Sequence, residues 1–88
     1  MIRPVNFPKY RFLETLRKSI GNSRFNLMNN QFYTLENGDK LIIENKNESS
    51  FVCNFISYTN TGEIAVSFQG KGLAIISPEI IKNIMSVH

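Results

Sequence analysis

The sequence has little of what most catalytic and metal sites are built from. It contains one cysteine, one histidine and no tryptophan. Cys53 has no second cysteine for a disulfide or a CxxC metal motif, and its apolar surroundings are typical of a buried, unreactive thiol. His88 is the last residue, where we do not expect the packed shell that a general base requires. We therefore expect no enzyme, no cofactor and no metal.

Acidic residues are scarce, and long apolar runs are missing. Glu36 and Asp39 flank a predicted turn and Glu44 and Glu48 flank a predicted loop, whereas a hard cation needs several converging oxygen ligands. No stretch approaches the roughly 18 apolar residues that span a membrane, or shows the apolar run of about 7–15 residues of a signal peptide. We expect a soluble protein with no membrane partner, and the lone cysteine favours a reducing, cytoplasmic location.

The length suits one small domain. The 88 residues, 42% of them hydrophobic, are enough for a single core and are not typical of a disordered chain. Pro4 and Pro8 favour extended backbone around them, so residues 1–8 are predicted to form an N-terminal arm. Residues 9–88 are predicted to form one domain.

Positive charge is concentrated near the N-terminus. The chain has 10 lysines and arginines against 7 acids, a formal net charge of +3. Six of the 10 cations but only one of the 7 acids fall in residues 1–24, which gives this stretch +5 and leaves the rest at −2. Such polarity sets a preferred face toward an anionic partner.

The segment after Pro8, KYRFLETLRKSI, predicts an amphipathic helix. Phe12, Leu13, Leu16 and Ile20 follow the spacing of one buried stripe, and Gly21 with Asn22 ends the pattern. The charged residues point away from the stripe, with Lys9 near its edge. They form either a solvated, salt-bridged face around Glu14 or a surface that contacts phosphate.

Aromatic residues are interleaved with these cations, an arrangement that holds single nucleic-acid strands. Phe12, Phe51, Phe55 and Phe68 are predicted core residues, whereas the phenol groups of Tyr10, Tyr33 and Tyr58 indicate partial exposure and leave a core role and a surface role equally open for each. Gly70-Lys71-Gly72 is interpreted as a hairpin turn, and the alternative is a loop that brings backbone amides and one ammonium near a phosphate. The candidate nucleic-acid-binding residues are Arg3, Lys9, Arg11, Arg17, Lys18, Arg24, Tyr33 and Lys71.

The rest of the chain predicts mainly β structure. Around Phe25 to Met28 the sequence is compatible with a short helix or a packing loop, and Gln31 to Leu35 alternates like a strand. Four further strands are predicted at 40–44, 50–58, 64–68 and 73–76. A turn at Asn37-Gly38-Asp39 precedes the first strand, a polar connection from Asn45 to Ser50 follows it, and turns at Asn60 to Glu63 and Gly70 to Gly72 separate the remaining strands. Ser77-Pro78-Glu79 predicts a helix start, and Ile80, Ile81, Ile84 and Met85 follow at helical spacing, whereas Ile81, Met85 and Val87 are equally compatible with an edge strand. Of these two alternatives for residues 78–87, we favour one helical turn that leads into a closing strand. The fold class is thus α+β, mainly β: a helix followed by a small, strongly bent antiparallel sheet or barrel.

This order of elements resembles that of the Sm-like (Hfq-like) small β-barrels. RFLETLRKSI looks like the first helix of that family, and SFVCNFISYTNTGEIAVSFQGKGLAIISPEIIKNIM is similar in layout to its later strands. The resemblance covers about half of the chain and implies RNA binding. The family's Tyr-Lys-His uridine motif has no match here, because Ile76-Ser77-Pro78-Glu79 stands in its place, and residues 22–38 have no family counterpart. Src-homology-like and KOW-like barrels share much the same pattern.

Two function classes follow. The first is a non-enzymatic module that binds nucleic acid, either RNA or single-stranded DNA, through the basic arm and helix with aromatic stacking. The second is a protein-interaction module, such as an inhibitor or adaptor from a phage or mobile element, that docks on an acidic protein surface. Open strand edges are compatible in both cases with a homo-oligomer, either a dimer or a ring.

Overall fold

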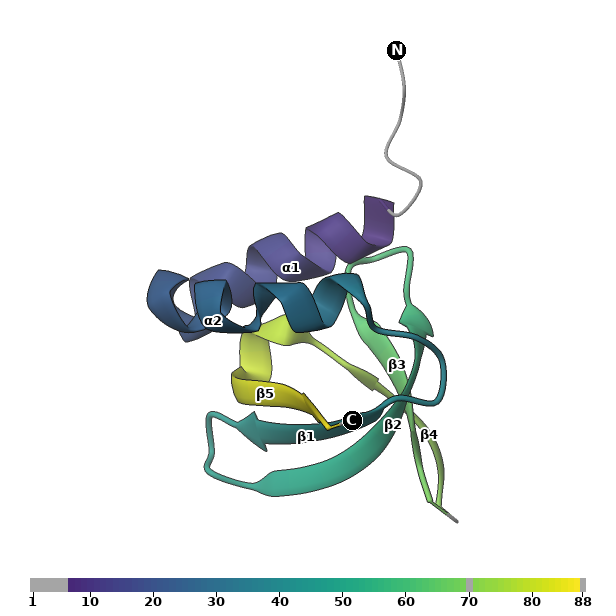
Figure 1. The fold of residues 1–88 in the computed structure, drawn as a ribbon. Helices are drawn as coiled ribbons and strands as arrows, with labels where there is room; N and C mark the ends of the chain where they lie inside the picture. Colours follow the sequence, from purple (N-terminus) through teal and green to yellow (C-terminus); the bar gives the residue numbers. More distant parts are fainter. Residues whose placement is uncertain (1–6, 70, 88) are drawn as a thin grey trace.

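The computed structural model describes residues 7–69 and 71–87, apart from the side chains of residues 29–31 and 33. Two helices precede five strands, and a short 3-10 helix interrupts the sheet before its last strand (Figure 1). The elements are α1 (Phe7–Ile20), α2 (Asn22–Tyr33), β1 (Lys40–Asn45), β2 (Ser50–Tyr58), β3 (Ile64–Phe68), β4 (Gly72–Ile76), η1 (Pro78–Ile80) and β5 (Ile81–Val87). The mixed α+β, mainly β class is therefore confirmed. Within the described ranges, no helix combines the length and apolarity needed to cross a membrane.

The predicted N-terminal helix is confirmed and starts at Phe7, two residues before the predicted domain boundary. Phe12, Leu13 and Leu16 are buried on its inner side. The chain then reverses at Gly21, whose φ of 94° is a left-handed value that favours glycine. α2 begins at the next residue, so the helices form a hairpin on one side of the sheet (Figure 1).

The second helix corrects one prediction. The strand expected at Gln31 to Leu35 is wrong, because α2 continues to Tyr33 and Leu35 lies in the following loop. Met28 and Phe32 are buried and Phe25 is partly buried, at a spacing of three and four residues that belongs to a helix. The Phe32 ring also meets Phe12 edge-on, with the ring centroids 6.1 Å apart. Packing against α1 therefore decides the conformation of this segment.

The four later strands are confirmed, and they form one antiparallel sheet with β5 in the order β4-β3-β2-β1-β5. The β2–β3 register shifts between Phe55 and Ser57, and the β1–β5 register shifts between Glu44 and Asn45. Such irregularities bend strands and increase their twist. The sheet accordingly curls around its inner side chains, and the helices lie across the open side (Figure 1).

The predicted C-terminal segment, one helical turn followed by a closing strand, is confirmed. The Ser77 hydroxyl caps η1 by accepting a hydrogen bond from the Glu79 backbone N–H at 3.4 Å. Ile81 and Ile84 of β5 then point into the core. Because η1 packs against α1, both ends of the described chain contribute to one folded unit.

The core lies between the curled sheet and the helical hairpin. Phe12 and Phe55 are buried as predicted. Phe51 and Phe68 are partly buried at the margin of the core, with their ring centroids 5.5 Å apart. The fully buried side chains include Leu16, Leu41, Ile43, Ile64, Val66, Ile81 and Ile84. This core fixes which face of α1 is left in solvent.

Candidate nucleic-acid interface

The solvent side of α1 carries the charged residues that the sequence placed there. Arg11, Glu14, Arg17 and Lys18 are all exposed. Their opposite face supplies the buried stripe, so their direction follows from the packing of the helix on the core. We call these four residues, together with the exposed Arg24 of α2, the helical-hairpin surface.

Three of its cations gather where the two helices meet. Arg17 and Lys18 lie in the last turn of α1, and Arg24 lies in the first turn of α2, all within four residues of Gly21. Glu14 is the only acid in α1 or α2. The corner of the helical hairpin is therefore locally cationic.

The protein's own acids neutralise little of this charge. The Lys18 ammonium lies 3.9 Å from a Glu14 carboxylate oxygen, but both side chains are mostly exposed, and such pairs stabilise a protein by at most about 1 kcal/mol. Across residues 7–69 and 71–87, no carboxylate lies within ion-pair distance of Arg11, Arg17 or Arg24. These three guanidinium groups remain open to an external anion.

Arg11 is held by the sheet as well as by its helix. A Cβ atom at Gly62, in the β2–β3 turn, would lie 2.8 Å from Cγ and 3.0 Å from Cδ of Arg11. The aliphatic part of Arg11 therefore lies directly on the Gly62 backbone, which has a φ of 82°. This contact anchors the side chain near its root while the residue as a whole stays exposed.

Lys9 does not belong to this surface. It is 8% exposed, and desolvation by burial lowers the pKa of its ammonium below the ordinary value. It precedes Phe12, Leu13 and Leu16 by three, four and seven residues, a spacing that puts it on the buried face. Its placement near the edge of the stripe is corrected: Lys9 lines a pocket of about 550 Å³ between α1, β2 and the α2–β1 loop.

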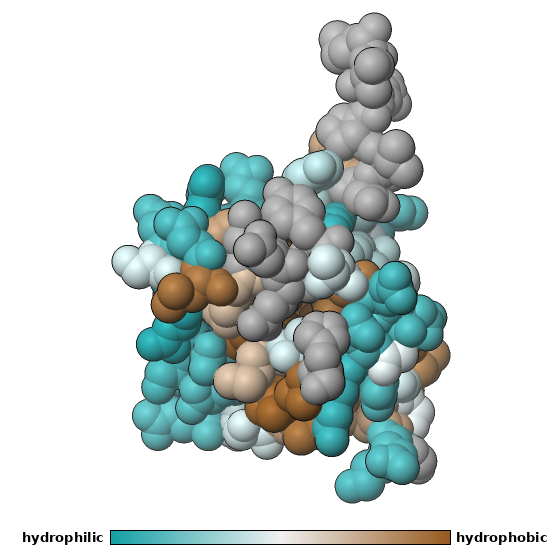
Figure 2. Space-filling view, viewed as in Figure 1, coloured by the Kyte–Doolittle hydropathy of each residue, from teal (hydrophilic) through white to brown (hydrophobic). Residues whose placement is uncertain are grey.

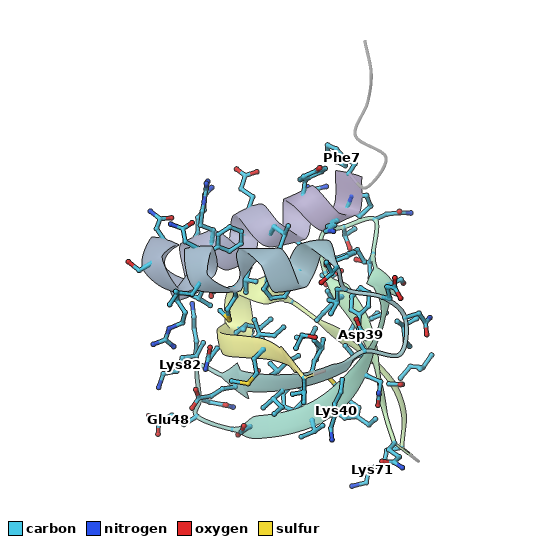
Figure 3. All side chains as sticks on the ribbon, viewed as in Figure 1. Phe7, Asp39, Lys40, Glu48, Lys71 and Lys82 are labelled. Carbon is cyan, nitrogen blue, oxygen red and sulfur yellow. The ribbon has the colours of Figure 1, made fainter. Side chains whose placement is uncertain are left out.

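The structure does not bring the remaining candidates to the helical-hairpin surface. Arg3 and the Tyr33 side chain lie outside the described residues. Lys71 is exposed in the β3–β4 turn, at the end of the molecule opposite to the start of α1 (Figure 3). Of the eight predicted binding residues, the helical-hairpin surface contains Arg11, Arg17, Lys18 and Arg24.

The aromatic side chains divide into core and surface groups. Tyr58 is partly buried against Phe12 and Phe55, with ring centroids 5.5 and 4.9 Å away, and its hydroxyl donates to the Phe32 carbonyl at 3.5 Å. Phe7 and Tyr10, by contrast, are 60% and 46% exposed on α1. These two rings, which are not among the predicted binding residues, share the solvent side of α1 with its cations.

Cys53 and Asp39 have structural environments and not those of a nucleophile or a metal ligand. Cys53 is buried in β2, and desolvation raises its pKa to about 11, so the thiol is protonated at neutral pH. Nowhere in the described ranges do three or more histidine, cysteine, aspartate or glutamate side chains come together. Asp39 accepts a hydrogen bond from the Glu36 backbone N–H at 2.8 Å, as expected of a turn acid.

Comparisons of this chain with protein-family models, with curated proteins and with solved structures gave no match.

Proposed function

We propose that this protein is a non-enzymatic nucleic-acid-binding module that contacts phosphates through the helical-hairpin surface. The observation that carries the proposal is the set of three exposed guanidinium groups, Arg11, Arg17 and Arg24, that lack carboxylate partners among the described residues. Guanidinium groups match phosphate oxygens in geometry and keep their charge at every physiological pH. Such contacts supply most of the sequence-independent affinity for nucleic acid.

The position of Arg24 supports a binding role. A cation in the first turn of a helix opposes the helix dipole, at a cost of about 0.3–1 kcal/mol. The first turn of α2 has no acid, and its N-cap, Gly21, offers no side-chain hydrogen bond. Arg24 thus sits where it weakens the helix, which is understandable if it serves a ligand.

The fold that we propose is a small barrel of the Sm-like or Src-homology-like kind. Its support is the element order: a basic helix, a bent antiparallel meander, a short turn and a closing strand. An Sm-like relationship agrees with RNA as the ligand. α2 is an addition to that plan, because the resembled family has no counterpart of residues 22–38.

A salt-dependence titration tests the proposed function. Each phosphate contact with a single strand contributes about 0.7 to the slope of log K against log salt concentration. Replacing Arg11, Arg17 and Arg24 by Gln should therefore reduce the slope by about 2 and weaken binding at low salt. All three residues are exposed, so circular dichroism should show an unchanged fold.

The matched control removes the same charge elsewhere. Lys40, Lys46 and Lys82 are exposed and belong to the β region, and their replacement by Gln also lowers the net charge by three. This variant should keep most of the slope. The proposal fails if the wild type does not bind oligonucleotides at low salt, or if both variants lose the same fraction of the slope.

A second candidate function is protein docking at the sheet edges. β4 and β5 are the outer strands of the sheet, and Leu73 on β4 is 76% exposed while Ile75, Met85 and Val87 are also exposed. Hydrophobic residues interrupt the hydrophilic surface near the end of β5 (Figure 2). Open edges of this kind accept a strand from an acidic partner protein or from a second copy. A nuclease-treated pull-down and light scattering test these two cases.

A further inference from the structure

We propose that α1 binds a single-stranded nucleic acid, with Phe7 and Tyr10 stacking on bases while the cations farther along the helix contact phosphates. This inference rests on the proposed function and names its substrate class. The rings of Phe7 and Tyr10 are both exposed. Phe7 is the only phenylalanine of the described chain that neither lies in the core nor packs against it.

The rings and the cations share one helical surface. Phe7 is followed after three residues by Tyr10 and after four by Arg11, the two spacings that make neighbours on a helix. Arg17 lies seven residues after Tyr10, and Lys18 lies seven residues after Arg11. Because seven residues make about two helical turns, Tyr10 with Arg17 and Arg11 with Lys18 form two rows along the same side of α1. Figure 3 shows Phe7 at the start of α1, on the side away from the sheet.

The length of this surface fits a short strand. Phe7 and Lys18 are eleven residues apart, which at about 1.5 Å per residue is roughly 16 Å along the helix. A stacked strand advances about 3.4 Å per nucleotide, so the surface spans roughly four or five nucleotides. Bases at the start of α1 and phosphates near Gly21 can therefore belong to one continuous segment.

The two exposed rings favour an unpaired strand over a duplex. Unpaired bases offer their faces to aromatic side chains, and such stacking tolerates any base. In a duplex the faces are covered by neighbouring base pairs, and exposing one requires extrusion of the nucleotide. A duplex would use the cations of α1 and leave the rings without a role.

Fluorescence anisotropy with three labelled probes tests the inference. The first probe is a thymidine oligonucleotide of about twelve nucleotides, within the range of site sizes of single-strand-binding modules. The second is an abasic chain with the same number of phosphates, and the third is a duplex of the same length. The wild type should bind the thymidine probe most tightly, because only this probe offers both phosphates and accessible base faces.

The Phe7→Ala/Tyr10→Ala variant should weaken binding of the thymidine probe by roughly 5- to 150-fold for each stacked ring. Its affinity for the abasic chain should not change. Phe7→Tyr/Tyr10→Phe keeps both rings and should bind like the wild type. Leu27→Ala is the matched control, because Leu27 is an exposed apolar residue of α2 outside this surface.

The outcomes separate this inference from the proposed function. Equal wild-type affinity for the thymidine and abasic probes, tighter duplex binding, or an unchanged Phe7→Ala/Tyr10→Ala variant would overturn single-strand stacking and leave phosphate binding intact. A wild type that binds none of the probes at low salt would overturn both. Circular dichroism of each variant shows whether a loss of binding comes from unfolding.

Discussion

Replacing Gly62 by alanine tests the contact through which the β2–β3 turn meets α1. Gly62 has a φ of 82°, and left-handed backbone costs an ordinary residue about 1–2 kcal/mol. The new Cβ atom would also lie 2.8 Å from Cγ of Arg11, an atom near the root of that side chain, so α1 or the turn must shift. We expect Gly62→Ala to lower the free energy of unfolding by about 2–3 kcal/mol in total.

Gly38→Ala is the internal reference for this experiment. Gly38 also has a left-handed φ, 98°, but nothing lies within 4 Å of its Cβ position. Its replacement should show the conformational cost alone. Urea unfolding followed by circular dichroism at the helical minimum measures both variants, because the chain has no tryptophan.

Arg11→Ala completes a double-mutant cycle. It removes the Cγ and Cδ atoms that crowd position 62 and leaves Cβ, which lies 3.3 Å from the new methyl position. Gly62→Ala should then cost at least about 0.5 kcal/mol less in this background than in the wild type. If Gly62→Ala costs no more than Gly38→Ala and Arg11→Ala leaves that cost unchanged, the packing of α1 on the β2–β3 turn is wrong.

Four further predictions concern other parts of the molecule. Arg24→Glu should stabilise the fold by about 0.3–1 kcal/mol in urea unfolding and weaken oligonucleotide binding in fluorescence anisotropy. If stability and affinity change in the same direction, the binding role of Arg24 is contradicted. Phe32→Ala should cost about 3–5 kcal/mol and Leu27→Ala less than about 0.5 in urea unfolding, and equal costs would show that the helical phase of α2 is wrong. Ser19→Ala should cost about 1 kcal/mol in the same assay, because the hydroxyl donates to the Ile81 carbonyl at 2.9 Å, and no loss would exclude that bond. Burial raises the pKa of Cys53 from 9.0 to about 11, so its contribution to stability should be complete below pH 9 and lost as the pH rises through 11. Burial also raises the pKa of Tyr58, so Cys53→Ala should reduce the decline of stability at high pH without abolishing it, and rapid reaction of the native thiol with Ellman's reagent at pH 8 would contradict the burial of Cys53.

The regular parts of the fold could be predicted because local sequence and tertiary structure agree there. The stripe from Phe12 to Ile20 has the period of a helix, and Gly21 ends it. The turn near Gly38 leads into β1 and the turn near Gly62 separates β2 from β3, and the inward residues of β1 and β3 alternate along the sheet. In the C-terminal segment, Ser77 and Pro78 identify the short helical turn directly.

α2 could not be predicted with the same certainty. Its helical period depends on three residues, Phe25, Met28 and Phe32, and the alternation from Gln31 to Leu35 competes with it. The conflict is resolved by the Phe12 and Tyr58 side chains, which contact Phe32 from distant parts of the chain. A contact of this kind cannot be derived from local pattern alone.

The candidate site was predicted in part. Exposure of Arg11, Arg17 and Lys18 follows from the helical phase, whereas the signal for Lys9 was present in its spacing to Leu13 and Leu16 and was missed. Phe7 and Tyr10 follow the same phase, but the sequence did not distinguish exposed rings from core rings. Lys71 showed that charge alone does not place a residue, since its turn lies far from the start of α1 (Figure 3).

The Ser19 hydroxyl joins the first helix to a strand 62 residues later. During synthesis the two helices leave the ribosome well before η1 and β5, the segments that pack against α1. The hairpin of α1 and α2 then carries its apolar side uncovered until translation has passed Ile81. We therefore expect folding to complete only after β5 has been synthesised, and nascent chains halted before Ser77 to be sensitive to protease along their whole length.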